Sequence, residues 1–188
     1  PGPACGLAQA AHGNDMRAAV SPLRAAGLSL SLLAAAQIDR APRLIWNATA
    51  SVPIGLYVAR ASHGPSLGDL VAVRLPEDLS SWVVERGYVG ADTLLLKRVT
   101  AVSGMTACRH DLDITIDGTV VAQAASNDRQ GRPLPRWTGC VTIGSDEVFL
   151  LVAGVADSLD GRYFGPLSGD TILGRAIPLW TFGGAEDA

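Results

Sequence analysis

The chemistry open to this sequence centres on its only lysine. Of the 15 lysine and arginine residues, every one is arginine except Lys97. An arginine guanidinium stays protonated in proteins, whereas a lysine amine can lose its proton when apolar groups surround it. Lys97 follows three consecutive leucines, Leu94 to Leu96. A lysine in such surroundings could act as a general base, although composition alone leaves chance as an equal explanation.

A serine in the segment 46–60 is a nucleophile that such a base could activate. Ser51 is followed by Val52 and Pro53. Proline lacks an amide donor and disfavours helix in the residue before it, so we expect Ser51 in an extended segment or a turn. A hydroxyl presented there could lie at a groove, with backbone N–H groups free to hold an oxyanion. Taken by itself, the segment also fits an ordinary loop that enters a strand.

The three histidines do not offer a base for this serine. His12 lies in a stretch without periodicity, and His63 lies in a loop rich in glycine and proline. His110 lies two residues after a cysteine that we expect to be bonded. A Ser-His-Asp triad is therefore not expected, and a neutral lysine is another established activator of serine. For this role the pKa of Lys97 must fall from ~10.4 to about 7–8, through desolvation in an apolar pocket.

The cysteines favour an oxidising compartment. Cys108 and Cys140 enclose a 31-residue segment, and Cys5 lies near the N-terminus. No cysteine and histidine spacing suits a structural zinc site, so no metal is expected. On a strand, Cys108 and His110 would share a face, which makes a nucleophile–base pair conceivable. A disulfide between Cys108 and Cys140 is the favoured alternative, and such bonds persist in exported proteins.

The bulk composition indicates a single folded domain after the N-terminal region. A chain of 188 residues can bury a substantial core. With 48% hydrophobic residues, 21 glycines and 11 prolines, the chain is typical of a turn-rich globular protein rather than a disordered one. The net charge of −3 gives no reason to expect a nucleic-acid partner.

The first 40 residues divide into two parts. Residues 1–16 lack periodicity and are predicted to be a flexible lead-in. Residues 17–40 contain fourteen uncharged residues, 25–38, preceded by Arg17 and Arg24. Because this stretch is shorter than the ~20 apolar residues of a spanning helix, a signal anchor, a cleaved signal peptide and a buried amphipathic helix all stay open. We favour the anchor, with both arginines on the cytoplasmic side and the following chain exported.

After residue 40 the hydrophobic pattern indicates a mainly β protein. Short apolar runs bounded by turn residues predict strands, and these runs are 68–76, 93–102, 112–123, 147–154 and 170–180. Within 112–123, Asp117-Gly118 suits a type I′ turn and predicts a hairpin. The single helical candidate is 76–87, where apolar residues recur on one face. Loops are expected at 60–67 and 124–140.

Three segments resemble the signal peptidase I clan in their order and spacing. They are NATASVPIGLY (47–57), LLLKRVTAVSG (94–104) and SLDGRYFGPLSGDTILGRAIPLW (158–180). The segment DRQGRPLPRWTGC (128–140) is similar to the TraF-type conjugative transfer signal peptidases within that clan. The resemblance implies a signal-peptidase/LexA-like antiparallel β-sheet fold with an N-terminal hydrophobic helix. It also implies that residues 41–188 form a serine peptidase domain.

The resemblance assigns a role to each matched residue. It makes Ser51 the nucleophile and Lys97 the general base. The other matches support this dyad: Thr49 and the Ser51 backbone N–H for the oxyanion, Ser158 to orient the lysine, and Asp160 and Arg162 as a charged pair. Two departures from the family pattern weaken this support. Gly161 stands where the family usually has serine, and the run VAGVAD (152–157) replaces an acidic, asparagine-containing run.

The implied activity is cleavage of an exported precursor protein without metal or cofactor. The resemblance implies a pilin-like substrate, with conjugation or type IV secretion components as further partners, and leaves hydrolysis and cyclisation equally open. It implies a bacterial inner-membrane protein, attached through its N-terminal segment, with the catalytic domain in the periplasm.

Two other functions compete with this prediction. A LexA-like self-cleaving regulator would carry an N-terminal DNA-binding domain, and residues 1–40 contain no helix-turn-helix pattern. A non-catalytic envelope module derived from a signal peptidase would tolerate the change at Gly161. Retention of both Ser51 and the single lysine argues against that alternative.

Overall fold

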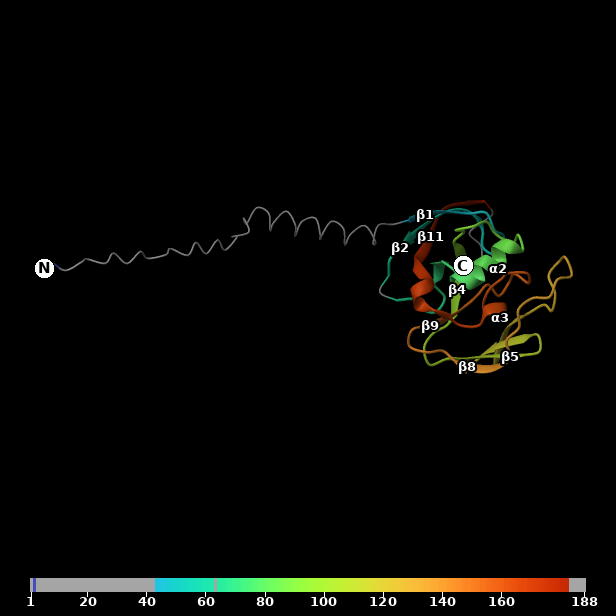
Figure 1. The fold of residues 1–188 in the computed structure, drawn as a ribbon. Coiled ribbons are helices and arrows are strands. Elements are labelled where there is room, and N and C mark those ends of the chain that lie inside the picture. The colour runs from blue at the N-terminus through green and yellow to red at the C-terminus, as the bar shows by residue number, and fades with distance from the viewer. Residues whose placement is uncertain (1, 3–42, 63, 183–188) are drawn as a thin grey trace. The chain divides into compact units, whose positions relative to one another are not determined.

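Two antiparallel β-sheets contain almost all the regular structure that the computed structural model describes, in residues 2, 43–62 and 64–182 (Figure 1). The larger sheet has seven strands in the order β1-β2-β11-β3-β4-β9-β10, and the smaller has four in the order β7-β6-β5-β8. The mainly β architecture expected from the sequence is therefore confirmed. The N-terminal hydrophobic helix and the segments 1–16 and 17–40 lie outside the described residues, apart from Gly2, and stay predictions.

Along the chain the elements are β1 (Arg43–Asn47), β2 (Ile54–Arg60), β3 (Leu70–Val73), α2 (Glu77–Glu85), β4 (Leu95–Ala101), β5 (Thr106–His110), β6 (Asp113–Ile116), β7 (Thr119–Gln123), β8 (Gly139–Thr142), β9 (Glu147–Leu151), α3 (Gly161–Phe164), β10 (Leu167–Ser168), the 3-10 turn η1 (Gly169–Thr171) and β11 (Ile172–Phe182). Among the described residues, no helix combines the length and apolar character needed to cross a membrane.

Strand β4 lies between β3 and β9 and contributes to three separate cores. Leu95 and Val99 pack in the first, which α2 covers through Val83. Leu96 packs in the second, among residues of β1, β2, β3 and β11. Ala101 packs in the third, which joins the larger sheet to the smaller one. Because both faces of β4 are covered, its sequence is a continuous apolar run rather than an alternating pattern.

The smaller sheet is built on the predicted hairpin. Strands β6 and β7 are joined by Asp117 and Gly118, whose φ angles of 47° and 81° fit the expected type I′ turn. Strand β5 pairs with β6 on one side and with β8 on the other. Phe149 and Leu151 of β9 pack against this sheet, while Val148 and Leu150 pack in the first core. Strand β9 therefore connects the two halves of the fold.

The predicted strands and the predicted helix are confirmed, with shifted ends. The apolar runs correspond to β3, β4, β6–β7, β9 and β11, and the helical candidate corresponds to α2. Strands β1, β2, β5, β8 and β10 and the short helix α3 were not predicted. These strands lack a clean alternation of apolar and polar residues, so pairing with neighbours decides their structure. Strand β8, Gly139–Thr142, begins inside the expected loop 124–140.

Candidate active site

Ser51 lies in the turn between β1 and β2. Asn47, the last residue of β1, is only 4% exposed and holds this turn together. Its Nδ2 donates to the carbonyl oxygens of Thr49 (2.9 Å), Val52 (3.1 Å) and Pro53 (3.1 Å). Carbonyl groups in a tight turn have no partner in a β-sheet. The single buried amide of Asn47 therefore satisfies carbonyl groups on both sides of the serine.

Tyr57 and Gly55 fix the strand that leaves this turn. The Tyr57 hydroxyl donates to the Pro53 carbonyl oxygen at 2.7 Å, and its ring is buried in the second core. Gly55 has a φ of 155°, and a Cβ there would lie 2.2 Å from the Trp180 carbonyl oxygen. Only glycine allows β11 to approach β2 so closely at this point.

Lys97 extends from β4 towards Ser51. Its Nζ lies 3.2 Å from Ser51 Oγ and 2.7 Å from Ser158 Oγ, and the residue is 4% exposed. Among the described residues no carboxylate forms an ion pair with this amine. The three side chains come from three separate parts of the chain, and the structure brings them within hydrogen-bonding distance.

Burial makes the Lys97 amine a weaker base than an exposed lysine. Its pKa falls from 10.5 to about 8, chiefly because desolvation penalises the ammonium form. Asp160 raises the pKa and Arg162 lowers it, each by a smaller amount. The total shift corresponds to about 3 kcal/mol against the charged form. A neutral amine that can accept a proton is therefore accessible near pH 8.

Asp160 and Arg162 form a fully buried ion pair beside the dyad. Arg162 Nε and Nη2 each lie 2.9 Å from a different oxygen of the Asp160 carboxylate. The same carboxylate accepts the backbone N–H groups of Arg162 and Val152, at 3.2 and 3.0 Å. Asp160 thereby caps the N-terminus of α3. Because its oxygens are occupied, Asp160 does not hold Lys97 in the charged form through direct contact.

Arg162 also organises the segment that precedes Ser158. Its guanidinium donates to the carbonyl oxygens of Val152 (2.9 Å), Val155 (2.7 Å) and Ala156 (3.2 Å). These residues belong to the run VAGVAD, which departs from the family pattern. The segment needs no acidic side chain for this contact, because its backbone carbonyl groups bind the guanidinium.

The second departure, Gly161, follows from the packing around α3. A Cβ at this position would lie 2.7 Å from the Leu150 carbonyl oxygen and 2.8 Å from Phe149 Cζ. Phe149 is fully buried in the third core and cannot move aside cheaply. A serine would therefore clash here. The glycine reflects close packing of α3 on β9 and leaves the geometry of the dyad intact.

Thr49 is placed differently from its predicted role. Its hydroxyl donates to Asn47 Oδ1 at 2.8 Å, and its backbone N–H donates to the same oxygen at 3.1 Å. The hydroxyl proton therefore points at Asn47. To help hold an oxyanion beside Ser51, this hydroxyl would have to rotate away from Asn47 when substrate binds.

A cleft of about 590 Å³ opens in front of the dyad. Ser51 and Lys97 lie in its wall, together with the C-terminal end of α2, the loop 124–134 and the segment 155–159. The loop is attached to the α2 side, because Asp128 accepts a hydrogen bond from the Tyr88 hydroxyl at 2.6 Å. Four further side chains make the cleft largely apolar: Val83, Leu95, Leu134 and Leu159. An extended peptide could lie here with its backbone near Ser51.

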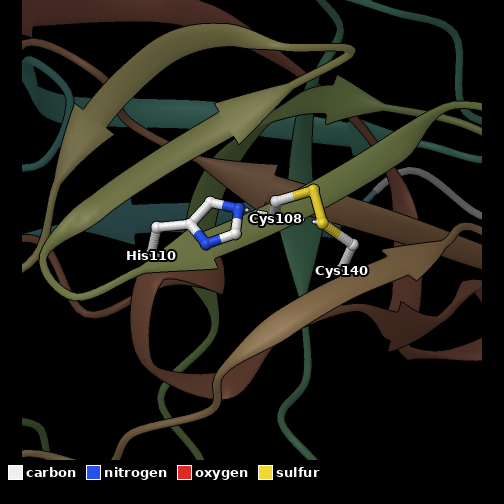
Figure 2. Close-up of side chains that lie close together, drawn as sticks. All are labelled: Cys108, His110 and Cys140. Atoms are coloured by element: carbon white, nitrogen blue, oxygen red, sulfur yellow. Dashed lines mark hydrogen bonds between the residues drawn. A yellow bond between two sulfur atoms is a disulfide. The ribbon is translucent and has the colours of Figure 1, made fainter.

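Cys108 and Cys140 form a disulfide between β5 and β8 in the smaller sheet (Figure 2). His110 lies on the same side, with its Nε2 3.9 Å from Cys140 Sγ. The two sulfurs and a ring nitrogen lie within 4.8 Å of one another. Because the disulfide uses both thiols, this group offers a metal ion one imidazole only. The cluster lies on the smaller sheet and does not line the cleft.

Residues 17–180 match the family model described as signal peptidase, peptidase S26. The chain belongs to this family of signal peptidases. It is 34% identical over 168 residues to the plasmid transfer protein TraF of Escherichia coli, which covers 84% of this chain and 92% of that protein. It is 33% identical over 178 residues to the conjugal transfer protein TraF of Agrobacterium fabrum, covering 88% and 97%. The predicted resemblance to TraF-type signal peptidases is confirmed.

A solved structure of signal peptidase I from Enterococcus faecalis V583 aligns with 59% of this chain and 95% of its own, at 18% identity and a TM-score of 0.36.

Sequence reasoning missed the residues that hold the site of this signal peptidase in shape. Asn47 was noticed only as part of a motif, although a polar residue at a strand end before a turn often bonds to the turn backbone. Two further residues, Arg109 and Trp137, carried no visible signal, although their side chains donate hydrogen bonds to carbonyl groups of α3. Their contacts join segments that lie far apart in the sequence.

Because the signal peptidase has one lysine, its titration can be observed directly. In Ser51→Ala protein labelled with ¹³C and ¹⁵N lysine, we expect a single side-chain resonance that titrates near pH 8. In denaturant it should titrate at ~10.4. Between these values the unfolded chain binds more protons than the folded one. The free energy of unfolding should therefore rise with pH over this range, as the cost of burying the ammonium disappears. A native midpoint above 10 would contradict the burial of the amine.

Replacing Asn47 should destabilise the turn that carries Ser51. Asn47→Ala leaves buried carbonyl groups without a donor, so the free energy of unfolding should fall by about 1–3 kcal/mol. Urea denaturation followed by circular dichroism would measure it. The matched control is Asn127→Ala, at an exposed position, which should stay within about 0.5 kcal/mol of the parent. Equal effects of both changes would argue against this role.

Proposed function

We propose that this signal peptidase is a serine endopeptidase in which Ser51 is the nucleophile and Lys97 the general base. The observation that carries the proposal is the 3.2 Å distance between Lys97 Nζ and Ser51 Oγ, with the amine buried. A nucleophile within reach of a base, with the base oriented by a third group, is the usual arrangement of nucleophilic catalysis. Ser158 is the third group, at 2.7 Å from the amine.

In the acylation step, Ser51 Oγ attacks the scissile carbonyl carbon while neutral Lys97 takes the hydroxyl proton. The backbone N–H of Ser51 donates to the developing oxyanion, and the Thr49 hydroxyl joins it after leaving Asn47. The tetrahedral intermediate collapses, the C–N bond breaks, and the Lys97 ammonium returns the proton to the leaving amine. Ser158 accepts an N–H of Lys97 throughout and keeps its nitrogen directed at the reacting atoms.

The acyl-enzyme is resolved by a second nucleophile with Lys97 again as base. Water yields hydrolysis, and an amine of the substrate itself yields a cyclic product. No metal ion or cofactor takes part in either outcome. The proposed substrate is an exported precursor protein that binds as an extended segment in the cleft. Similarity to proteins named for plasmid and conjugal transfer supports a pilin or another conjugation precursor, with type IV secretion components as partners.

We further propose that the enzyme works at the periplasmic face of the inner membrane. Large apolar side chains are exposed on three neighbouring strands, β1, β2 and β11, and they are Leu44, Trp46, Ile54, Ile177, Leu179, Trp180 and Phe182. Trp46 and Trp180 each pair with Leu56 of β2 and so lie on one face of the sheet. Phe182 contacts both indoles, with centroid distances of 6.2 and 4.4 Å.

The chemistry of this aromatic patch suits a lipid surface. The exposed face of an antiparallel sheet is normally polar, and a large apolar patch marks an interaction site. Tryptophan is enriched where proteins meet the membrane–water interface. Strand β1 begins at Arg43, directly after the apolar segment 17–40 in the sequence. The patch would therefore lie against the bilayer, with the disulfide in an oxidising periplasm.

The alternatives have less support. A self-cleaving regulator needs its own cleavage segment in the cleft, and the described residues place none there. A non-catalytic module was favoured chiefly by Gly161, and close packing against Phe149 accounts for that residue. A degenerate copy would also have no reason to keep its one lysine buried between two serines.

Two substitutions test the dyad in cells that also express a candidate prepilin. Ser51→Ala should abolish processing, and Lys97→Arg should reduce it by about 10²–10⁴-fold or more, because a guanidinium cannot accept the proton. Mass spectrometry would identify the cut site and any cyclic product. Arg98→Lys, at the neighbouring position outside the dyad, is the matched control. Near-normal cleavage by Lys97→Arg would disprove the neutral-amine mechanism.

Membrane contact can be measured by quenching of tryptophan fluorescence in vesicles of brominated phospholipid. The full-length wild type should be quenched, and the double variant Trp46→Phe/Trp180→Phe should lose most of this quenching, since its remaining indoles lie away from the patch. The double variant Trp82→Phe/Trp137→Phe is the matched control and should remain quenched. Quenching that depends on the second pair instead would exclude the proposed orientation.

A further inference from the structure

Helix α3 is too short to satisfy its own carbonyl groups. It spans Gly161–Phe164, and its only backbone hydrogen bond onto the Gly161 carbonyl comes from the Gly165 N–H, at 3.0 Å. The Arg162 carbonyl would need the N–H of residue 166, which is Pro166 and has none. A buried carbonyl without a donor is costly, so a donor for the Arg162 carbonyl must come from elsewhere in the fold.

One side chain of the smaller-sheet region supplies the donor that the Arg162 carbonyl lacks, and another adds a second hydrogen bond to the Gly161 carbonyl. Arg109 of β5 donates from Nη1 to the Arg162 carbonyl oxygen at 2.5 Å. Trp137, two residues before β8, donates from Nε1 to the Gly161 carbonyl oxygen at 3.0 Å. Both bonds hold the same short helix from the same side.

Arg109 is an unusual residue to bury. It is 2% exposed, and within the described part of the chain no carboxylate pairs with it. Carbonyl oxygens of Asp111, Pro135 and Arg162 accept its hydrogen bonds, and its guanidinium lies 5.9 Å from the Tyr163 ring centroid. A buried charge without a carboxylate partner costs stability, and here three carbonyl oxygens offset that cost.

Packing adds to the hydrogen bonds. The Trp137 ring packs edge-to-face on Phe149, with centroids 6.1 Å apart, and Phe149 in turn touches the backbone of Gly161. The disulfide joins Cys108, the neighbour of Arg109, to Cys140 directly opposite on β8. The segments that carry the two donors are therefore tied to one another.

The position of α3 determines the surroundings of Lys97. Asp160 caps α3 and pairs with Arg162, and Ser158 precedes this cap by two residues. Ser158 Oγ in turn lies 2.7 Å from Lys97 Nζ. A displacement of ~1 Å in such a chain of contacts can lower a catalytic rate by about 10²-fold.

From these contacts we propose that Arg109 and Trp137 are positioning residues for the Ser51–Lys97 dyad, acting through the two carbonyl groups of α3. The inference rests on the proposed function. The smaller sheet is thereby part of the machinery that aligns the lysine, although none of its strands supplies a reacting group.

The test combines a rate with a readout that does not depend on cleavage. Trp137→Phe removes one N–H donor and keeps a ring against Phe149. It should lower kcat about tenfold with KM nearly unchanged. In the Ser51→Ala background with labelled lysine, the Lys97 titration midpoint should rise by about half a unit, because water reaches the amine as α3 moves away.

Arg109→Lys tests the second donor, since one ammonium cannot reach three carbonyl groups. The matched control is Arg136→Lys, whose side chain is 54% exposed and pairs with Asp111. Arg136→Lys should match the wild type in both kcat and the Lys97 titration midpoint. If Arg109→Lys fails to fold, as thermal unfolding would reveal, Trp137→Phe alone decides the matter.

Unchanged kcat and an unchanged Lys97 midpoint in Trp137→Phe would overturn the inference. The wild type could also cleave no precursor while the Lys97 midpoint still shifts in Trp137→Phe. That result would support the positioning of Lys97 and refute the proposed peptidase activity. The two failures are therefore distinguishable.

Discussion

The site depends on keeping a lysine amine buried without giving it a carboxylate partner. A carboxylate in contact with Lys97 would hold the ammonium form and remove its capacity as a base. The acidic group that raises the pKa of Lys97 is Asp160, whose oxygens are occupied by Arg162 and by two backbone N–H groups. Opposite effects of Asp160 and Arg162 on the Lys97 pKa leave desolvation as the leading cause of the shift. The ion pair thus gives rigidity next to the amine without fixing its charge.

Desolvation of the amine follows from the place of β4 in the fold. Neighbouring strands cover both of its edges, and its residues enter all three cores. A strand covered on every side can present one polar side chain to a cleft while its neighbours exclude water from the rest of that side chain. Ser51 comes from a turn at the end of β1, where Asn47 satisfies the carbonyl groups that a turn exposes.

Two buried arginines solve a similar problem in the irregular parts of the chain. Segments without ladder partners leave carbonyl groups that need donors. Arg162 binds those of the segment 152–156, and Arg109 binds those of Asp111, Pro135 and Arg162. A guanidinium with five N–H donors in a fixed plane suits this task better than a single ammonium. This difference agrees with the use of arginine for both buried structural cations and of the one lysine beside Ser51.

Local sequence was sufficient for the elements that local rules govern. The apolar runs predicted the main strands, Asp117-Gly118 predicted the hairpin turn, and the periodicity of 76–87 predicted α2. Strands β1, β2, β5, β8 and β10 escaped prediction because their residues do not alternate cleanly between apolar and polar. The leucines before Lys97 correctly indicated an apolar setting, but only Leu95 can share a strand face with it, because successive side chains alternate.

The sequence by itself determined which residues can do chemistry here: one serine in a turn, one lysine in an apolar run, and motifs in register with a peptidase family. Tertiary structure alone decided whether they meet, since 46 residues separate Ser51 from Lys97 and 61 separate Lys97 from Ser158. It also decided that Gly161 is a packing requirement, that the Thr49 hydroxyl is bonded to Asn47, and that α3 takes its donors from Arg109 and Trp137. The reason is physical: burial, proton affinity and hydrogen-bond satisfaction depend on neighbours in space, which sequence spacing does not specify.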